Sequence, residues 1–379
     1  MQTLRSRERL KANQFMEDIQ KDKIQSFSET LSRKDEHLDL CSQKNVNSIG
    51  SAGWEHITLP HSALPDLNFD EISLESKFLD KNFSAPLLIS SMTGGSARGE
   101  QINQTLALFA QEMKIPMGVG SQRIFLEDKS EKILGSQEVF NLRKVAPRAV
   151  LYANIGAVQL NYGVSIKDCL YLIEKLQAQA LILHLNPLQE AIQKEGNRNF
   201  KNLWPKISEL CKQSSVPIIL KETGCGLDAQ TCRRAHEVGI KAIDIAGFGG
   251  THWGYIEGLR HTERASLGEQ FRSWGIPTTE ALIEARSILG KSFPIIASGG
   301  IRNGLEAAKA IYLGADFTGL ALPFLKAFDQ KTEAEQVEKL KKTYFELCEA
   351  LKISLFCTNS ANIAKLKDKG LTLYEVEPH

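Results

Sequence analysis

Short apolar runs recur eight times between residues 86 and 321. Each run ends in a turn that carries polar or Gly residues, and segments of helical periodicity, such as residues 166–178 and 305–315, fill the gaps. This alternation predicts parallel strands connected by helices. The predicted strands are residues 86–90, 115–119, 149–154, 180–185, 216–221, 242–246, 294–298 and 315–321.

Eight strand–helix units predict an α/β protein whose sheet closes into a (β/α)₈ TIM barrel over residues 86–330. This span is close to the ~250 residues typical of that fold. A doubly wound open sheet is the alternative fold. Its GxGxxG fingerprint is missing from the first strand-to-helix turn, which favours the barrel.

Three segments lie outside the alternation. Residues 1–85 are expected to form an N-terminal extension and a cap on the barrel, with a loop and short strands over 50–80. Residues 331–379 contain an apolar helical stripe and are expected to pack as a C-terminal helical segment on the barrel. Residues 247–277 predict a long loop after the sixth strand, and such loops are usually functional lids or disordered.

Composition and charge narrow the class of protein. Hydrophobic residues make up 42% and charged residues 24% of the chain, which is typical of globular proteins. A net charge of +1 gives no electrostatic reason to expect nucleic acid or an acidic membrane surface as a partner. The seven cysteines include no CxxC pair, which argues against a disulfide framework or a structural zinc site. No apolar run approaches the ~20 residues of a membrane helix, and the N-terminus lacks a secretory signal, so a cytoplasmic location is expected.

Polar residues and glycines gather where the predicted strands end, which is where barrel enzymes build their active sites. Any one of them has an ordinary structural explanation, but all eight strand ends carry such residues. The segments are SMTGG at 91–95, GSQR at 120–123, Asn154, the segment with His184, Asn186, Gln189 and Glu190, then Lys221 and Glu222, AGFGGTHW at 246–253, SGGIRNG at 298–304, and 319–322.

Two of these strand ends suggest anion binding. The turn after strand seven carries Gly299, Gly300 and Arg302, and phosphate sites of these barrels form from the loops after strands seven and eight. A buried Lys221 requires an anion opposite it, such as the edge of a reduced flavin, unless it pairs with Glu222 or extends to solvent. For His184, a core histidine with one hydrogen bond is the simpler interpretation.

Several motifs together resemble the type 2, flavin-dependent isopentenyl-diphosphate isomerases. The resemblance covers residues 33 to about 330. The motifs are RKDEHL (33–38), HSALPDLNFDEI (61–72), SMTGG, GVGSQR, ANIG, HLNPLQEAIQKEGNRNF (184–200), VPIILKETGCG, GGTHW and SGGIR.

The resemblance implies isomerisation of isopentenyl diphosphate to dimethylallyl diphosphate by a 1,3-proton shift, with reduced FMN as acid and base. It further implies Mg²⁺, NADPH as a priming reductant, and a homo-oligomer, a tetramer or octamer. The implied FMN contacts are Met92, Thr93, Gly94, Ser121, Asn154, Lys221, Thr251, Gly299, Gly300, Ile301, Arg302, Ala321 and Leu322.

The same resemblance implies that Arg33, Lys34, Ser121, Gln122 and Arg123 bind the diphosphate. Gln189 would lie at the reacting alkene, with His184 and Asn186 as further catalytic candidates, and Glu190 would bind Mg²⁺. Three positive side chains and an oxygen-bound Mg²⁺ suit a diphosphate. The chain departs from the family pattern at Phe248, Lys194 and Asn197. Phe248 stands where the family pattern has a small residue in a glycine-rich turn, so the shape of the flavin-side loop is in doubt. The basic extension of residues 1–32 is expected to be a solvated tail.

Two other functions are considered. An FMN-dependent TIM-barrel oxidoreductase would usually place a His or Cys base at the flavin face, where this chain has Asn186 and Gln189. A flavin- or phosphate-binding barrel without catalysis would be expected to lack Gln189, Glu190 or Arg33, and all three are present.

Overall fold

Eight parallel strands close into a barrel in the computed structural model, which describes residues 32–127 and 142–371. Each strand pairs with its neighbours in sequence order, and the last pairs with the first. The predicted TIM barrel is thus confirmed, and the open-sheet alternative is wrong. The strands are β3 (Leu87–Ile89), β4 (Met117–Gly118), β5 (Leu151–Gly156), β6 (Ala180–Leu185), β7 (Ile218–Glu222), β8 (Ala242–Asp244), β9 (Ile295–Ser298) and β10 (Phe317–Leu320).

Amphipathic helices surround the barrel because their apolar faces cover the outside of the strands. Side-chain oxygens accept backbone N–H bonds at the first turns of several, as Ser96 does for α2, Asp228 for α8 and Asn303 for α12. The helices of this layer are α2 (Ala97–Met113), α3 (Arg123–Glu127), α4 (Leu142–Val145), α5 (Ile166–Leu176), α6 (Pro187–Ile192), α7 (Leu203–Gln213), α8 (Ala229–Glu237), α11 (Thr278–Leu289), α12 (Gly304–Tyr312) and α13 (Leu322–Leu325).

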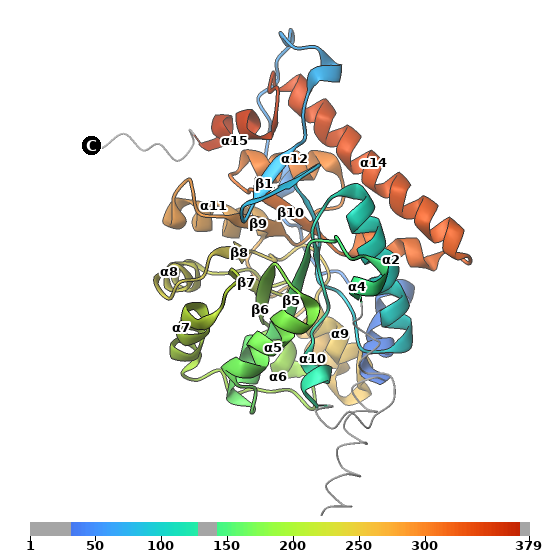
Figure 1. The fold of residues 1–379 in the computed structure, drawn as a ribbon, viewed down its shortest axis with the longest axis vertical. Coiled ribbons are helices and arrows are strands. Elements are labelled where there is room, and N and C mark those ends of the chain that lie inside the picture. The colour runs from blue at the N-terminus through green and yellow to red at the C-terminus, as the bar shows by residue number, and fades with distance from the viewer. Residues whose placement is uncertain (1–31, 128–141, 372–379) are drawn as a thin grey trace, which may run out of the picture.

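A hairpin of β1 (Ser76–Phe78) and β2 (Lys81–Phe83) closes the N-terminal end of the barrel. Its Phe78 and Phe83 rings lie 5.0 and 5.4 Å from the ring of Phe317. Figure 1 shows this hairpin at one end of the barrel, with the blue N-terminal helix (residues 32–43) and α9 toward the other. The apolar end is therefore filled by aromatic side chains, and polar chemistry is left to the C-terminal end.

The segment 247–277 is not the irregular loop that its length suggested. It contains two packed helices, α9 (Trp253–Arg260) and α10 (Ala265–Gln270). A Cβ placed on Gly258 would lie 2.6 Å from the Cα of Gly268, so the two backbones meet where neither residue has a side chain. Gly258 and Gly268 thus serve helix packing rather than irregular loop structure.

The C-terminal region forms α14 (Glu333–Cys357) and α15 (Ile363–Leu371), which pack against α12. A capping box of Thr332 and Glu335 begins α14. This long helix runs along the outside of the barrel (Figure 1). Within the described residues, no helix is long and apolar enough to cross a membrane.

The hydroxyl of Tyr152 allows a test of packing in the apolar end. It is buried among the residues of the β1–β2 end and has no hydrogen-bond partner within the described part of the chain. Tyr152→Phe should raise the free energy of unfolding by about 1 kcal/mol, because an unsatisfied buried donor is removed. Calorimetric melting measures the change.

The matched control is Tyr344→Phe. The Tyr344 hydroxyl lies 3.0 Å from Ser84 Oγ, so its removal should cost about 1 kcal/mol. Equal destabilisation by both substitutions would mean that Tyr152 has a partner, such as a buried water.

Candidate active site

A cavity opens at the C-terminal ends of the barrel strands, lined by residues from all eight of them or the loops that follow. The structure brings nearly all the predicted site residues together here. They are Arg33, Lys34, Met92, Thr93, Gly94, Ser121, Arg123, Asn154, His184, Asn186, Gln189, Glu190, Lys221, Thr251, Gly299, Gly300, Ile301, Arg302, Ala321 and Leu322.

Gln122 is the predicted residue that the cavity lining does not include. Its side chain is buried, and its Oε1 accepts the backbone N–H of Asn154 at 3.0 Å. Its own backbone N–H donates to the Asn154 carbonyl at 2.8 Å. Gln122 thus links the ends of β4 and β5. Its amide fixes the backbone of Asn154, which lines the cavity.

Lys221 is neutralised inside the protein. Its ammonium group is buried and lies 3.1 Å from Asp244 Oδ2, and Ser298 Oγ donates to the other oxygen of Asp244 at 2.5 Å. These three residues come from the consecutive strands β7, β8 and β9. The sequence-based expectation that Glu222 or a bound anion would be the partner of Lys221 missed Asp244.

Glu222 faces the loop after β7. Its Oε2 accepts the backbone N–H groups of residues 223–226, at 2.6, 2.6, 2.5 and 3.2 Å. Burial raises the pKa of Glu222 to about 7, against these hydrogen bonds and the charge of Lys221. Adjacent residues of a strand point to opposite faces, so Lys221 and Glu222 have separate roles.

His184 is held as one neutral tautomer. Asn154 Nδ2 donates to the carbonyl of Val119, so Asn154 Oδ1 accepts, and it lies 2.8 Å from His184 Nδ1. The proton of neutral His184 therefore sits on Nδ1, and Nε2 remains an acceptor. Burial and the charge of Lys221 lower the pKa of His184 to about 4.

Unpartnered hydroxyls mark the side of the cavity formed by β3. The buried Oγ atoms of Ser90 and Ser91 and the Oγ1 of Thr93 have no hydrogen-bond partner within the described residues. All three residues line the cavity. Such groups are costly unless a polar ligand or water meets them, so this wall fits a flat ligand rich in hydrogen-bonding atoms, such as a flavin ring.

Glycines bring the loops after β8 and β9 together. A Cβ on Gly250 would lie 2.6 Å from the backbone N of Gly300, and one on Gly299 would lie 2.2 Å from the carbonyl of Gly247. Gly299 and Gly300 also have φ values of 101° and 73°. Only glycine suits these positions, and the tight loops leave backbone facing the cavity, as phosphate binding requires. Arg302 lies beside them, with its guanidinium donating to Asn47 Oδ1 at 2.8 Å.

Gln189 and Glu190 begin the site's polar wall on α6. Gln189 Nε2 donates to Glu257 at 2.9 Å, and Gln189 Oε1 accepts from Asn186 Nδ2 at 3.1 Å. The Glu190 carboxylate accepts from Asn186 Nδ2 at 3.1 Å and from the backbone N–H of Asn197 at 2.5 Å. Burial raises the pKa of Glu190 against these hydrogen bonds. No cluster of three or more metal-ligating side chains occurs among the described residues, so a metal at Glu190 would depend on ligands from substrate or water.

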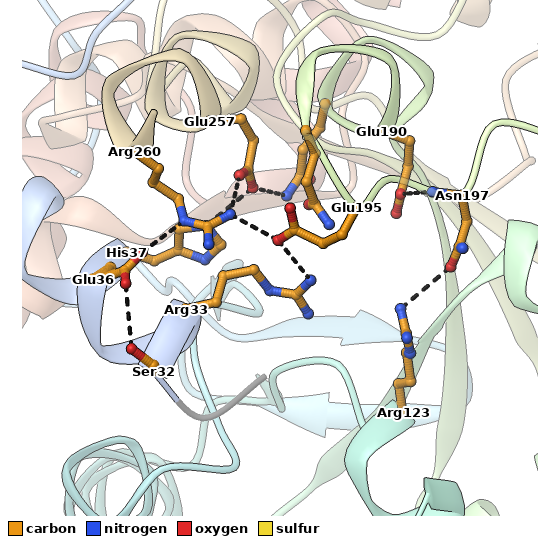
Figure 2. A network of polar contacts seen from close by, with 12 residues as sticks. Ser32, Arg33, Glu36, His37, Arg123, Glu190, Glu195, Asn197, Glu257 and Arg260 are labelled. Atoms are coloured by element: carbon orange, nitrogen blue, oxygen red, sulfur yellow. Dashed lines mark hydrogen bonds and ion pairs between the residues drawn. The ribbon is translucent and has the colours of Figure 1, made fainter. Parts of the chain in front are cut away.

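The N-terminal helix places cations over the cavity. Arg33 lies 3.6 Å from Glu195, and Lys34 Nζ donates to the carbonyl of Ser121 at 3.2 Å. On the facing wall, Arg123 donates to Asn197 Oδ1 at 3.2 Å (Figure 2). The structure thus gathers three cationic side chains at one rim.

Glu257 joins this helix to α9 and was not predicted. Its carboxylate lies 3.0 Å from His37 Nε2 and 2.7 Å from Arg260, whose guanidinium also reaches Glu36 at 2.9 Å and Glu195 at 3.0 Å (Figure 2). Burial works to raise the pKa of Glu257, but the hydrogen bonds and charges of His37 and Arg260 prevail and lower it to about 2. In the sequence, Glu257 and Arg260 look like an ordinary i,i+3 helix pair, which carries no signal of burial.

Phe248 lies away from the cavity. Its buried ring packs where a Cβ on Gly50 would come within 2.7 Å, and its Cβ faces Gly275. The large side chain therefore fills a space between loops and leaves the cavity lining unchanged.

Comparisons with known proteins show the family of the chain. A family model described as FMN-dependent dehydrogenase matches residues 41–369. An isopentenyl-diphosphate delta-isomerase of Synechococcus sp. is 46% identical over 351 residues, which are 92% of this chain and 98% of the relative. One of Rickettsia bellii is 43% identical over 350 residues, 91% of this chain and 98% of the relative. The chain belongs to the isopentenyl-diphosphate delta-isomerases of the FMN-dependent dehydrogenase family. The resemblance inferred from the motifs is confirmed.

Solved structures outside the isomerases share the fold alone. A flavocytochrome b2 variant has a TM-score of 0.63 at 18% identity, covering 94% of this chain and 88% of that one. A mandelate oxidase variant has a TM-score of 0.60 at 13% identity, covering 88% and 94%. Isomerase-family members and these enzymes therefore use a common barrel architecture.

The lowered pKa of His184 predicts a pH-dependent stability. Unfolded His184, with a pKa near 6.5, binds a proton at higher pH than the folded residue, whose pKa is about 4. The unfolded state thus binds more protons as the pH falls from 6.5 to 4, and stability is lost across that window, by up to about 3 kcal/mol. His184→Gln should remove this part of the loss, measured by denaturant unfolding at several pH values. Identical pH dependence in both proteins would mean that His184 titrates normally.

Proposed function

We propose that this protein isomerises isopentenyl diphosphate to dimethylallyl diphosphate by a 1,3-allylic proton shift, using reduced FMN. The observation that carries the proposal is the pairing of two half-sites in one cavity. One side offers hydroxyls without a partner in the described part of the chain, suited to a flavin ring, and glycine backbone suited to its phosphate. The rim offers Arg33, Lys34 and Arg123 for a diphosphate. Relatives named for this reaction share 43% to 46% of their residues with the chain.

FMN is proposed to lie across the barrel mouth, with its ring along β3 and its phosphate at the loops after β9 and β10. The ring would meet the hydroxyl of Thr93 and the ammonium of Lys221, and the phosphate would meet the backbone of Gly299 and Gly300 with Arg302. Asn154 would contact the ring from β5. The remaining proposed contacts, all lining the cavity, are Met92, Gly94, Ser121, Thr251, Ile301, Ala321 and Leu322.

The diphosphate is proposed to bind at the rim together with Mg²⁺. Arg33, Lys34 and Arg123 would neutralise its charge, and Ser121 would offer a hydroxyl. Mg²⁺ commonly uses one or two carboxylates plus substrate phosphates and water. Glu190 would be that carboxylate, because it lies close to the rim residues through Asn197, which accepts a bond from Arg123.

Reduced FMN, when bound, supplies the group that donates and recovers protons. The chain itself positions the alkene. Gln189 has both ends of its amide fixed, by Glu257 and Asn186, so its polar atoms are presented in one orientation. His184 stays neutral at physiological pH and offers a hydrogen-bond acceptor without adding positive charge. Asn186 orients both Gln189 and Glu190.

Several finer assignments belong to the same proposal. NADPH would act only as a priming reductant, and the protein would work in the cytoplasm as a homo-oligomer, a tetramer or octamer. The division into an N-terminal extension and cap (1–85), barrel (86–330) and C-terminal segment (331–379) is also proposed. Residues 1–31, which include most of the basic extension, lie outside the described residues.

An anaerobic turnover count separates an isomerase from an oxidoreductase on this barrel. With FMN, Mg²⁺ and isopentenyl diphosphate, the protein should form many equivalents of dimethylallyl diphosphate for each NADPH oxidised, because a proton shift consumes no electrons. Chelating Mg²⁺ should stop product formation and leave FMN bound. A ratio near one product per NADPH, or no allylic product from fully reduced enzyme, would overturn the proposal.

Gln189→Ala tests the position of the alkene. The substitution should lower kcat by ~10² or more, the range of positioned proton-transfer groups, and leave the affinity for FMN nearly unchanged. Steady-state kinetics and flavin fluorescence titration measure the two quantities. Arg98→Ala, which removes an exposed ion pair with Asp39, is the control and should leave kcat unchanged. A loss below tenfold in Gln189→Ala would make Gln189 only a structural neighbour.

A further inference from the structure

The buried ion pair at the barrel centre has a residue to which the proposed reaction gives no role. Asp244 is fully buried at the end of β8, directly opposite Lys221 in the strand register. Its Oδ2 lies 3.1 Å from Lys221 Nζ, and its Oδ1 accepts from Ser298 Oγ at 2.5 Å. Ser298 Oγ also lies 3.4 Å from Lys221 Nζ. One carboxylate oxygen is thus held by a hydrogen bond, and the other faces the ammonium at ion-pair distance.

We propose that Asp244 is a positioning residue that holds the Lys221 ammonium at the cavity and offsets its charge, and thereby sets the reduction potential of bound FMN. The inference rests on the proposed function, in which Lys221 contacts the flavin. Asp244 does not line the cavity, whereas Lys221 and Ser298 do, so its effect passes through Lys221.

The charges around Lys221 explain why this carboxylate is needed. His184 is the register partner on β6, and it is neutral near pH 7 because burial and Lys221 lower its pKa. Glu222 precedes the loop whose amides hold its carboxylate, on the opposite face of β7. Among the described residues, Asp244 is therefore the carboxylate that pairs with the ammonium. Without it the Lys221 charge would be buried with no opposite charge in contact.

The same pair opposes electron transfer to the flavin. Reduction by dithionite to the anionic reduced form adds two electrons and one proton to FMN. Lys221 stabilises the resulting negative charge, and Asp244 weakens that stabilisation because the pair is neutral overall. Removal of the Asp244 charge should therefore favour reduced over oxidised FMN.

Asp244→Asn in the FMN-loaded, full-length protein tests this. The variant should bind reduced FMN at least tenfold more tightly relative to oxidised FMN, which raises the midpoint potential by about 30 mV or more for a two-electron couple. Dithionite titration of the bound flavin measures the potential.

The control is Asp316→Asn. Asp316 is also ion-paired, to Arg286 at 2.9 Å and to Lys367, but it lies at the N-terminal end of β10, at the far end of the barrel. This variant should lose stability and keep the parent potential. An unchanged or lowered potential in Asp244→Asn, or an equal shift in Asp316→Asn, would overturn the inference.

Melting temperatures of a double-mutant cycle test the same pair if the variant binds FMN too weakly for a potential to be measured. Without added FMN, Asp244→Asn should melt at a lower temperature than the parent, because the Lys221 charge is left buried and unpaired. Adding Lys221→Met should recover at least half of that loss. No recovery would show that Asp244 acts independently of Lys221.

Failure of the proposed function gives a different result. If the protein binds FMN and shifts its potential as expected but forms no dimethylallyl diphosphate, the reaction is wrong and the role of Asp244 stands. If the parent binds no FMN at all, both the proposed function and the control of a flavin potential are overturned.

Discussion

Closure of the barrel is the constraint on which the rest of the structure depends. β10 pairs with both β9 and β3, so the sheet has no free edge and all eight parallel strands end around one opening. Residues far apart in the chain thereby come within hydrogen-bond distance. Lys221, Asp244 and Ser298 meet because β7, β8 and β9 are neighbours in register, and Asn154 meets His184 through β5 and β6.

The two ends of the barrel fill their interiors in opposite ways. At the N-terminal end, Phe78, Phe83 and Phe317 pack ring against ring, and stability comes from buried apolar area. At the C-terminal end the strands present a lysine, an aspartate, a histidine and an asparagine, which tolerate burial because each has a partner. Dividing apolar packing from polar pairing in this way lets one end carry chemistry while the other maintains the fold.

Much of the fold follows from the sequence because strand-helix alternation is a local signal. All eight predicted strands exist, with ends displaced by a few residues. Of the strand predicted over 115–119, β4 covers Met117–Gly118. The prediction of a long loop at 247–277 is wrong, because the packing of Gly258 against Gly268 needs both helices in place. Composition alone does not distinguish glycines that flex from glycines that pack.

The sequence motifs predicted which residues line the candidate site. They did not predict which charged side chains form ion pairs there. The Lys221–Glu222 pairing considered from the sequence conflicts with the alternation of side chains along a strand, which could have excluded it. Asp244 stands alone as an acid in an apolar run and was a visible signal, but its partner depends on strand register. Glu257 lies in a helix with ordinary charge spacing, and only the tertiary contact with His37 shows that it is buried.

The helix of residues 32–43 brings Arg33 and Lys34 to the cavity from outside the barrel sheet. Ion pairs attach this helix to α9 and to the loop after α6. Glu36 and Glu195, which take part in these pairs, remain partly exposed. Two of the three cations at the rim consequently come from this leading segment, and the third, Arg123, comes from the barrel. Exchanging the leading segment would therefore remove two cations from the rim, while Arg123, the strands and the glycine loops stay as they are.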